Sequence, residues 1–352
     1  MGPRTRFSFE LKTQRRLDAV LTDPIFKEAQ QRWGIHSQTR VCAFRFEQEN
    51  TSGTVQEGAS HGGGVVVAGA LRFSGFHKGM LQDLLVSFFE STAVREALAL
   101  CAAPKALGDA VQYTELYCSW TTLEPFMRLV EAGVVRRVEL SEDVPRDEAE
   151  AAIFDGAVRF PVVRRADVYL PHDIAVTDEL RALFLLAPSR AMCHEEEEEE
   201  DEAWNTCSYG SGARLSLGTL RGIFSATERS EFLYHIVWRF VAGGGNNNQW
   251  DEDLGVYLDL ARMWYKSLVA IRAVHTEETT AVAGGMDEPD RAADVDSGAL
   301  IPEVVSTVVA VQAVGGLSLF ARSDEVEPSN LNYCYVCIDP VEAEVVVWYH
   351  CL

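Results

Sequence analysis

The sequence predicts an α+β fold, in which an antiparallel sheet that includes a C-terminal β-hairpin packs against an αα-hairpin and several further helices. Three observations lead to this prediction. The C-terminal segment alternates in side-chain type around an Asp-Pro turn, and two segments between residues 228 and 273 have helical periodicity. Acidic and Gly/Asn-rich stretches interrupt these elements and contain too few apolar residues to order themselves, so we expect disordered insertions.

The C-terminal segment has the pattern of a hairpin. In residues 332–338, one set of side chains alternates with another: Tyr333, Tyr335 and Cys337 against Cys334, Val336 and Ile338. Asp339-Pro340 then supplies turn chemistry, and residues 345–350 are strongly β-forming. Since residues three apart on a strand point to opposite faces, the thiols of Cys334 and Cys337 are expected to diverge.

Segments 228–242 and 251–273 predict two antiparallel helices joined by the Gly/Asn-rich residues 243–248. In the first helix, apolar residues cover about two-thirds of the circumference, so we expect it to be buried on most sides. The remaining stripe holds Glu228, Glu231, His235 and Arg239. In the second helix, an apolar seam recurs at helical spacing through Leu254, Tyr257, Ala261, Trp264, Leu268 and Ile271.

Local signals predict the other elements. Asp23 caps a helix that begins at Pro24 and stops at Gly34. Further helices are expected at 81–100, between Thr122 and Gly133, and after a Thr177 cap, and strands at 41–46, 65–73 and 158–170. Residues 304–320 are too short and too β-branched for a membrane helix and indicate two strands.

The predicted organisation has three parts. Residues 1–188 form an N-terminal α+β part, residues 189–215 an acidic disordered insertion, and residues 216–352 the helix pair with the C-terminal hairpin. We expect the first and last parts to share one compact domain. Further spacers lie at 49–64, 243–248 and 276–298, and residues 195–202 are all acidic.

Charge excludes some classes of partner. The chain carries 31 Lys and Arg against 53 Asp and Glu, a net charge of −22. Because this field repels phosphate backbones and anionic lipid, we expect neither a nucleic-acid partner nor a membrane partner. The N-terminus lacks the apolar core of a signal peptide, so the eight cysteines are expected to be reduced thiols in the cytoplasm.

The motifs that could carry chemistry each have a structural alternative. Cys334-x-x-Cys337 on a strand cannot converge as a zinc knuckle does, and it lacks the helix N-terminus that lowers a redox thiol's pKa. The His61–Gly64 sequence HGGG matches an oxyanion-hole motif, but no Gly-x-Ser-x-Gly elbow follows. The Glu231 and His235 side chains are four apart and could form an acid–base pair, although such a stripe is usually a solvent face.

These readings predict no catalytic, cofactor-binding or metal-binding residue, no cofactor and no enzyme. They favour a binding or scaffolding role. The alternative that stays open is an uncharacterised hydrolase or metal-binding enzyme that uses His61, His235 or the terminal thiols.

Several stretches, taken in order, resemble the cilia- and flagella-associated protein 300 family. They are residues 30–46, 83–90, 168–185, SEFLYHIVWRFVAGG at 230–244, YLDLARMWYKSLVAIR at 257–272, and YVCIDPVEAEVVVWYHC at 335–351. Together they span most of the chain outside the spacers. The acidic tract and residues 276–298 look like additions relative to the family.

The resemblance implies a function. Proteins of this family assemble outer and inner dynein arms of motile cilia and act in the cytoplasm and the axoneme of the cilium or flagellum. The implied partners are kintoun-like dynein-arm assembly factors, axonemal dynein subunits and the intraflagellar transport machinery. The family contributes no catalytic residues to this chain.

Overall fold

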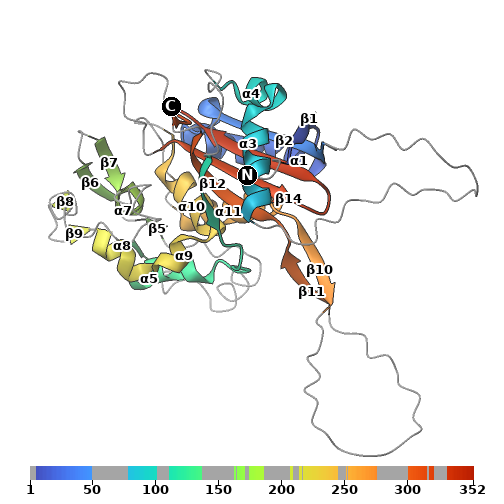
Figure 1. Cartoon of the computed structure of the whole chain (residues 1–352). Coiled ribbons are helices and arrows are strands. Elements are labelled where there is room, and N and C mark those ends of the chain that lie inside the picture. The colour runs from blue at the N-terminus through green and yellow to red at the C-terminus, as the bar shows by residue number, and fades with distance from the viewer. Residues whose placement is uncertain are drawn as a thin grey trace, which may run out of the picture.

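The computed structural model describes residues 5–49, 78–100, 111–136, 162–163, 165–170, 174–185, 207–208, 214–215, 217–244, 251, 253–275, 300–314, 317–320 and 331–352 (Figure 1). The predicted strand at 65–73, the HGGG motif and most of the predicted spacers lie outside these residues. Within the described part, helices and an antiparallel sheet confirm the predicted α+β class.

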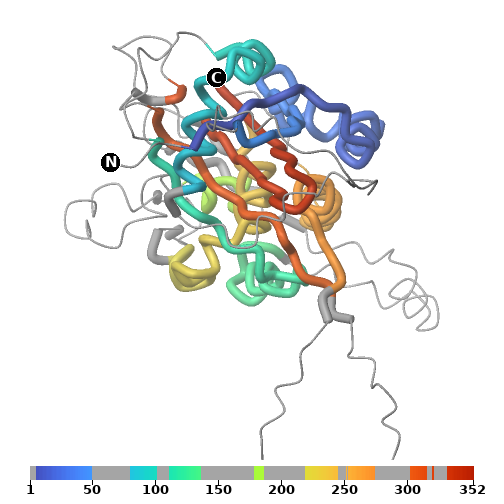
Figure 2. The backbone as a smooth tube through the Cα atoms, turned by 45° about the vertical axis from the view of Figure 1, so that its right-hand side comes forward, coloured from blue at the N-terminus to red at the C-terminus, as the bar shows by residue number. Residues whose placement is uncertain are grey.

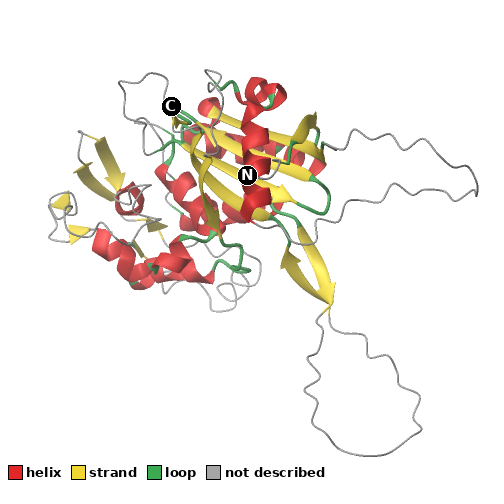
Figure 3. Cartoon of the chain, in the orientation of Figure 1, coloured by secondary structure: helices red, strands yellow, loops and turns green. Residues whose placement is uncertain are grey.

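A seven-stranded antiparallel sheet forms the centre of the molecule (Figure 3). Its strands lie in the order β1-β2-β15-β14-β12-β13, and β3 also pairs with β12. The bounds are β1 Phe7–Lys12, β2 Thr39–Gln48, β3 Val111–Leu116, β12 Thr307–Val314, β13 Leu317–Ser318, β14 Tyr333–Asp339 and β15 Glu344–His350. Strands from residues 7–116 therefore pair directly with strands from residues 307–350 in one sheet.

The predicted C-terminal hairpin is confirmed as β14 and β15, and it lies inside the sheet. Asp339 makes the turn, since its Oδ1 accepts hydrogen bonds from the amides of Val341 (2.9 Å) and Glu342 (3.2 Å). Every residue of both strands is buried. Both strands have neighbours on both edges, and both of their faces are buried. Because the hairpin has no solvent-facing side, polar and apolar residues do not alternate along its sequence.

Helices cover both faces of the sheet (Figures 1 and 2). Helices α3 (Lys78–Glu90) and α4 (Thr92–Leu98) pack on the face that carries Phe7, Phe44 and Val347. The opposite face carries Tyr335 and Trp348 and packs on a larger helical layer. That layer contains α1 Arg15–Thr22, α2 Pro24–Arg32, α7 Glu179–Leu185, α8 Leu217–Ile223, α10 Phe232–Ala242 and α11 Leu254–Leu268.

The N-terminal region contains one helix that was predicted and two elements that were not. The α2 helix begins as expected, because Asp23 Oδ1 accepts the Phe26 amide at 2.9 Å and Pro24 occupies the first turn. Gly34 follows at φ 68°, the left-handed conformation that ends such helices. Strand β1 and helix α1 precede it, and the sequence analysis did not predict either of them.

The other predicted helices are shorter than expected. The segment 81–100 divides at Ser91 into α3 and α4. The segment between Thr122 and Gly133 forms the 3-10 turn η2 (Glu124–Met127) and α5 (Arg128–Glu131). The expected Thr177 cap is wrong: Thr177 lies in β7 (Ile174–Asp178), and the Asp178 carboxylate accepts the Arg181 amide at 2.6 Å. A carboxylate caps an N-terminus at least as well as a hydroxyl.

Short strand pairs complete the structure. The predicted strand at 158–170 is described only in part, as β5 Val162–Val163 and β6 Arg165–Leu170, which pair with β4 Val135–Arg136 and β7 respectively. Strands β8 (Cys207–Ser208) and β9 (Arg214–Leu215) pair with each other, as do β10 (Ile271–His275) and β11 (Leu300–Val304). Within the described residues, no helix has both the length and the apolar character that a membrane crossing needs.

Candidate functional site

The helix pair α10–α11 is confirmed, with corrected ends. The segment before α10 forms a separate turn, α9 (Ala226–Arg229), because Ser225 and Glu228 make a capping box there. Glu231 then occupies the N-cap position of α10, although its side chain accepts no hydrogen bond from the helix. At the other end, α11 stops at Leu268, so the inclusion of Ile271 in its apolar seam was wrong; Ile271 begins β10 and is 43% exposed.

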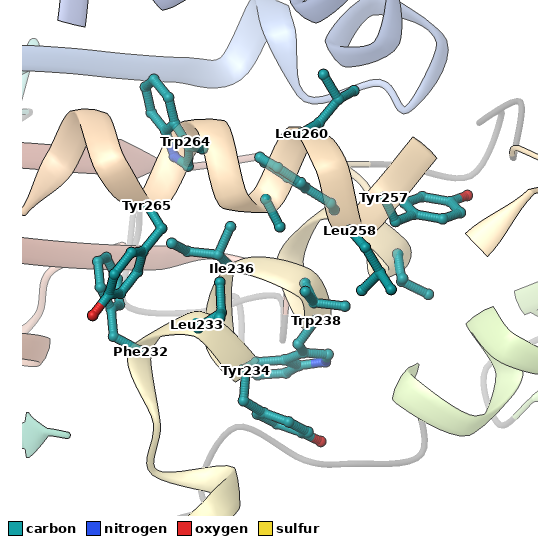
Figure 4. Packing of buried hydrophobic residues seen from close by; sticks show 14 of the residues in the cluster. Phe232, Leu233, Tyr234, Ile236, Trp238, Tyr257, Leu258, Leu260, Trp264 and Tyr265 are labelled. Atoms are coloured by element: carbon teal, nitrogen blue, oxygen red, sulfur yellow. The ribbon is translucent and has the colours of Figure 1, made fainter. Parts of the chain in front are cut away.

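Helix α10 is buried on all sides, as its apolar sweep predicted in large part. Phe232 lies beside Tyr265 of α11, with ring centroids 5.9 Å apart, and Ile236 lies between the two helices (Figure 4). On the sheet side, Phe232 also contacts Tyr335 of β14 at 5.6 Å. Burial of this many large side chains makes α10 the centre of the larger core.

The polar stripe on this helix is not a solvent face, and that interpretation was wrong for three of its four members. Glu231, His235 and Arg239 are 2%, 5% and 5% exposed. The elements around α10 close over the stripe, with β14 on one side and the chain after β3 on another. The fourth member, Glu228, lies in α9, where Arg128 forms an ion pair with it and lowers its pKa to about 2.

Two side chains of the stripe meet on one phenol. His235 Nδ1 lies 2.9 Å from the Tyr335 hydroxyl oxygen, and Arg239 Nε donates to the same oxygen at 2.9 Å. The Arg239 guanidinium also lies over three rings, 3.6 Å from the Trp238 centroid, 4.8 Å from that of Tyr333 and 5.8 Å from that of Tyr335. Hydrogen bonding and cation–π contact together stabilise a charge in the interior.

Glu231 binds a different part of the chain from His235. Its carboxylate accepts the amides of Ser119 (3.0 Å) and Trp120 (3.4 Å) and the Ser119 hydroxyl. Backbone bonds reinforce the contact, from Tyr117 N to Ser230 O and from Phe232 N to Tyr117 O. The start of α10 is therefore fixed to the loop that follows β3. These hydrogen bonds give the Glu231 carboxylate a structural partner other than the His235 ring.

The buried histidines are neutral at pH 7. Burial, followed by the charge of Arg239, lowers the pKa of His235 to about 3 and that of His350 to about 4. His350 Nδ1 lies 3.0 Å from Thr39 Oγ1, and the ring stacks on Tyr333. A general base needs a pKa near the working pH and access to a substrate, and neither ring has both.

The thiols of the C-terminal hairpin diverge as predicted. Cys334 packs in the core beneath α3, whereas Cys337 packs on the opposite face beneath the helix pair. Burial raises the pKa of both thiols, so neither forms the thiolate that binds metal or attacks a substrate. In the part of the chain that the structure describes, no group of three or more His, Cys, Asp and Glu side chains is placed to hold a metal ion.

A second polar contact, which the sequence analysis did not find, joins α2 to the start of α11. Trp33 Nε1 donates to Asp251 Oδ2 at 2.6 Å, and Arg32 pairs with Asp251 Oδ1 at 2.7 Å. The Asp251 amide donates to the Tyr257 hydroxyl at 3.0 Å. Trp33 and Asp251 are 218 residues apart, and no local pattern could connect them.

Comparison with models of known protein families shows which family this chain resembles. Residues 220–285 match the model for cilia- and flagella-associated protein 300, a range that includes α9, α10 and α11. The predicted resemblance is confirmed over this region. No solved structure matches the chain. The match to the cilia- and flagella-associated protein 300 family supports a role associated with cilia or flagella, and it falls on the helix pair at the centre of the larger core.

Proposed function

We propose that this chain is a non-enzymatic factor for the cytoplasmic assembly, and the intraflagellar transport, of outer and inner axonemal dynein arms. The observation that carries the proposal is the match of residues 220–285 to the cilia- and flagella-associated protein 300 family. The described residues of this range build much of the larger core, so they set the shape of a folded body. A protein of this kind acts through its surface, by binding other proteins.

The chemistry of the described interior supports a binding role. Its histidines are held neutral, its hairpin thiols are held protonated, and the buried Arg239 guanidinium lies over the aromatic rings of Trp238 and Tyr333. None of these groups has the perturbed and accessible character that is typical of catalysis. We propose dynein-arm assembly factors of the kintoun type and axonemal dynein subunits as partners, and the cytoplasm and axoneme as locations.

Affinity purification from a flagellate cell tests this proposal. The tagged chain should recover dynein heavy chains, assembly chaperones or transport proteins above the level obtained with a tagged, unrelated acidic protein. Recovery of none of these classes would reject the assembly role. Elemental analysis of the purified chain addresses the enzyme alternative, because stoichiometric zinc that is lost in a Cys334→Ser variant would favour a metal enzyme.

A further inference from the structure

Strands β10 and β11 form an arm that leaves the body of the molecule. Their pairing runs from Ile271↔Val304 to His275↔Leu300 and does not join the seven-stranded sheet. In both views the arm extends away from the helices and the sheet (Figures 1 and 2). A two-stranded ribbon alone in water is only marginally stable. Pairing with an additional strand would therefore stabilise an extended ribbon of this kind.

The base of the arm is fixed to the body. The Val305 amide donates to the Ala270 carbonyl at 3.0 Å, and the Ala270 amide donates to the Ser306 hydroxyl at 2.8 Å. Arg272 extends this anchor, because its Nη2 lies 2.9 Å from Glu342 Oε1 and 3.6 Å from Asp339 Oδ2 in the β14–β15 turn. The direction of the arm is therefore set by the central sheet.

The two outer edges of the arm differ. Because the Val305 amide donates to the Ala270 carbonyl, Ala270 and Val305 occupy a hydrogen-bonded position. Hydrogen-bonded and non-hydrogen-bonded pairs alternate from there, so Ala273↔Pro302 is a non-hydrogen-bonded pair. The Pro302 nitrogen, which has no hydrogen to donate, therefore faces the outer edge of β11. On β10, Ile271 and Ala273 direct their amides and carbonyls to the opposite outer edge. Among the described residues neither has a backbone partner there.

The surface at the base of the arm is apolar and acidic. Ile271 and Val341 are 43% and 44% exposed, and each is the sequence neighbour of one member of the Arg272–Glu342 ion pair. They are two of the six exposed large apolar side chains in the described residues. Glu303 adds an exposed carboxylate on β11, so acids outnumber the single arginine. The sequence that joins the two strands, residues 276–299, contains seven acidic residues and one arginine.

The negative charge of the arm and of the whole chain indicates which kind of partner can bind the outer edge of β10. A second copy of the chain would bring another net charge of −22 to an acidic surface, which opposes self-pairing. Nucleic acid and anionic lipid are repelled for the same reason. We propose that the outer edge of β10 receives an extended segment of a partner protein, basic with alternating apolar side chains, as an added strand. This inference rests on the proposed role of the chain as a protein-binding factor.

A peptide of alternating lysine and valine, eight residues long, is a suitable probe for the full-length chain. It should bind, and hydrogen exchange should show new protection at the amides of Ile271 and Ala273. Ala273→Pro removes the outward amide while leaving the hydrogen-bonded pairs of the arm intact, and should weaken binding at least about tenfold. Ala273→Val keeps the edge and should bind like the unaltered chain. Equal binding by the Ala273→Pro chain, or protection at other sites only, would overturn the proposal.

The side-chain contact has its own pair of variants. Ile271→Ser removes the apolar contact without changing the charge and should weaken binding of the lysine–valine peptide, whereas Ile25→Ser, on the 67% exposed Ile25 of α2, should not. A glutamate–valine peptide of the same length should fail to bind. Equal loss in the Ile25→Ser chain would contradict an apolar contact at Ile271, and equal binding of the acidic peptide would contradict recognition by charge at this edge.

Cells separate this inference from the proposed function. In a null flagellate that lacks dynein arms, the Ala273→Val chain should restore them and the Ala273→Pro chain should not, at equal protein levels. Full restoration by Ala273→Pro would reject the arm as the docking edge and leave the assembly role standing. A null cell with complete arms would reject the assembly role, whereas peptide binding in vitro would still report on the edge.

Discussion

Trp264 joins the helix pair to both α2 and the sheet. Its ring stacks on Phe26 at 5.0 Å and meets Trp348 edge-on at 5.7 Å, and it is fully buried. Trp264→Ala should lower the free energy of unfolding by about 3–5 kcal/mol, because it removes these contacts and leaves a cavity. Denaturant titration measures the loss. Ile25→Ala, at an exposed site on α2, is the control and should change the free energy by less than about 0.5 kcal/mol.

His235 and His350 make stability depend on pH. Their folded-state pKa values, about 3 and about 4, lie below the ordinary value of about 6.5 in the unfolded chain. Each therefore contributes stability that is complete above pH 6.5 and is lost as the pH falls toward its folded-state pKa. Between pH 7 and pH 5, each histidine should account for about 2 kcal/mol of the decrease in the free energy of unfolding.

The variants His235→Asn and His350→Asn test this, since asparagine places a polar atom near the position of Nδ1 and does not titrate. Each should reduce the difference in unfolding free energy between pH 7 and pH 5, whatever its effect at pH 7. Contributions from other groups are common to both chains and cancel. An unchanged difference in the double variant would show that the histidines are not held neutral in the fold.

At the scale of elements, Glu231 connects α10 to the loop after β3. Glu231→Ala removes the partly buried hydrogen bonds that the amides of Ser119 and Trp120 donate to the charged carboxylate, and it should cost about 1–3 kcal/mol. Hydrogen exchange should quicken at Ser119 and Trp120 before it does in β14. Glu231→Gln keeps an acceptor and should lose less than the alanine variant. Equal losses in both would mean that the hydrogen bonds to the carboxylate contribute little.

Replacement by alanine should have opposite effects on stability at two glycines. A Cβ on Gly244, just after α10, would lie 2.4 Å from the Gly34 carbonyl oxygen and 3.0 Å from His350 Cε1. Gly244→Ala should therefore destabilise the chain, because backbone must move. Gly222, in α8, has nothing within 4 Å of that position, and Gly222→Ala should stabilise by up to about 1 kcal/mol through helix propensity. An unchanged or higher melting temperature in Gly244→Ala would contradict the close approach, and a lower one in Gly222→Ala would contradict the open position in α8.

The elements that the sequence predicted are those with strong local signals. The Asp23-Pro24 start of α2, the apolar periodicity of α10 and α11, and the Asp339-Pro340 turn each act within a few residues. Strand β1 (FSFELK) alternates apolar and polar residues over only six positions at the edge of the sheet, and this short signal was overlooked. The break between α9 and α10 was also missed, since it depends on Glu231 binding a loop more than a hundred residues away.

The sequence identified the polar residues of the candidate site, but it did not predict that they are buried. The stripe through Glu231, His235 and Arg239 was visible in the sequence, yet a helix with polar residues along one side usually exposes them. Here Tyr335, 96 residues after Arg239, supplies the hydroxyl that meets two of them. Alternate residues of β14 face opposite sides of the sheet, and Tyr335 is on the side of the helix pair. This follows from the sheet register rather than from any local motif.

At the scale of the whole molecule, the two ends of the chain depend on each other. Strand β15 lies between β2 and β14, so the C-terminal hairpin supports both the N-terminal strands and the helix layer above them. Loss of the hairpin would expose both cores at once. The seven-stranded sheet therefore holds the two ends of the chain together, and the arm, which we propose as a docking edge, extends from this sheet and its helices.

Electron microscopy of axonemes from a null flagellate tests the central claim, that the chain acts in dynein-arm assembly. Outer and inner arms should be missing or reduced on intact microtubule doublets, and the unaltered chain should restore them. Trp264→Ala should restore them poorly, because a chain that has lost much of its stability, typically about 5–15 kcal/mol for a domain, is cleared by quality control. Complete arms and normal beating in the null cell would contradict the account.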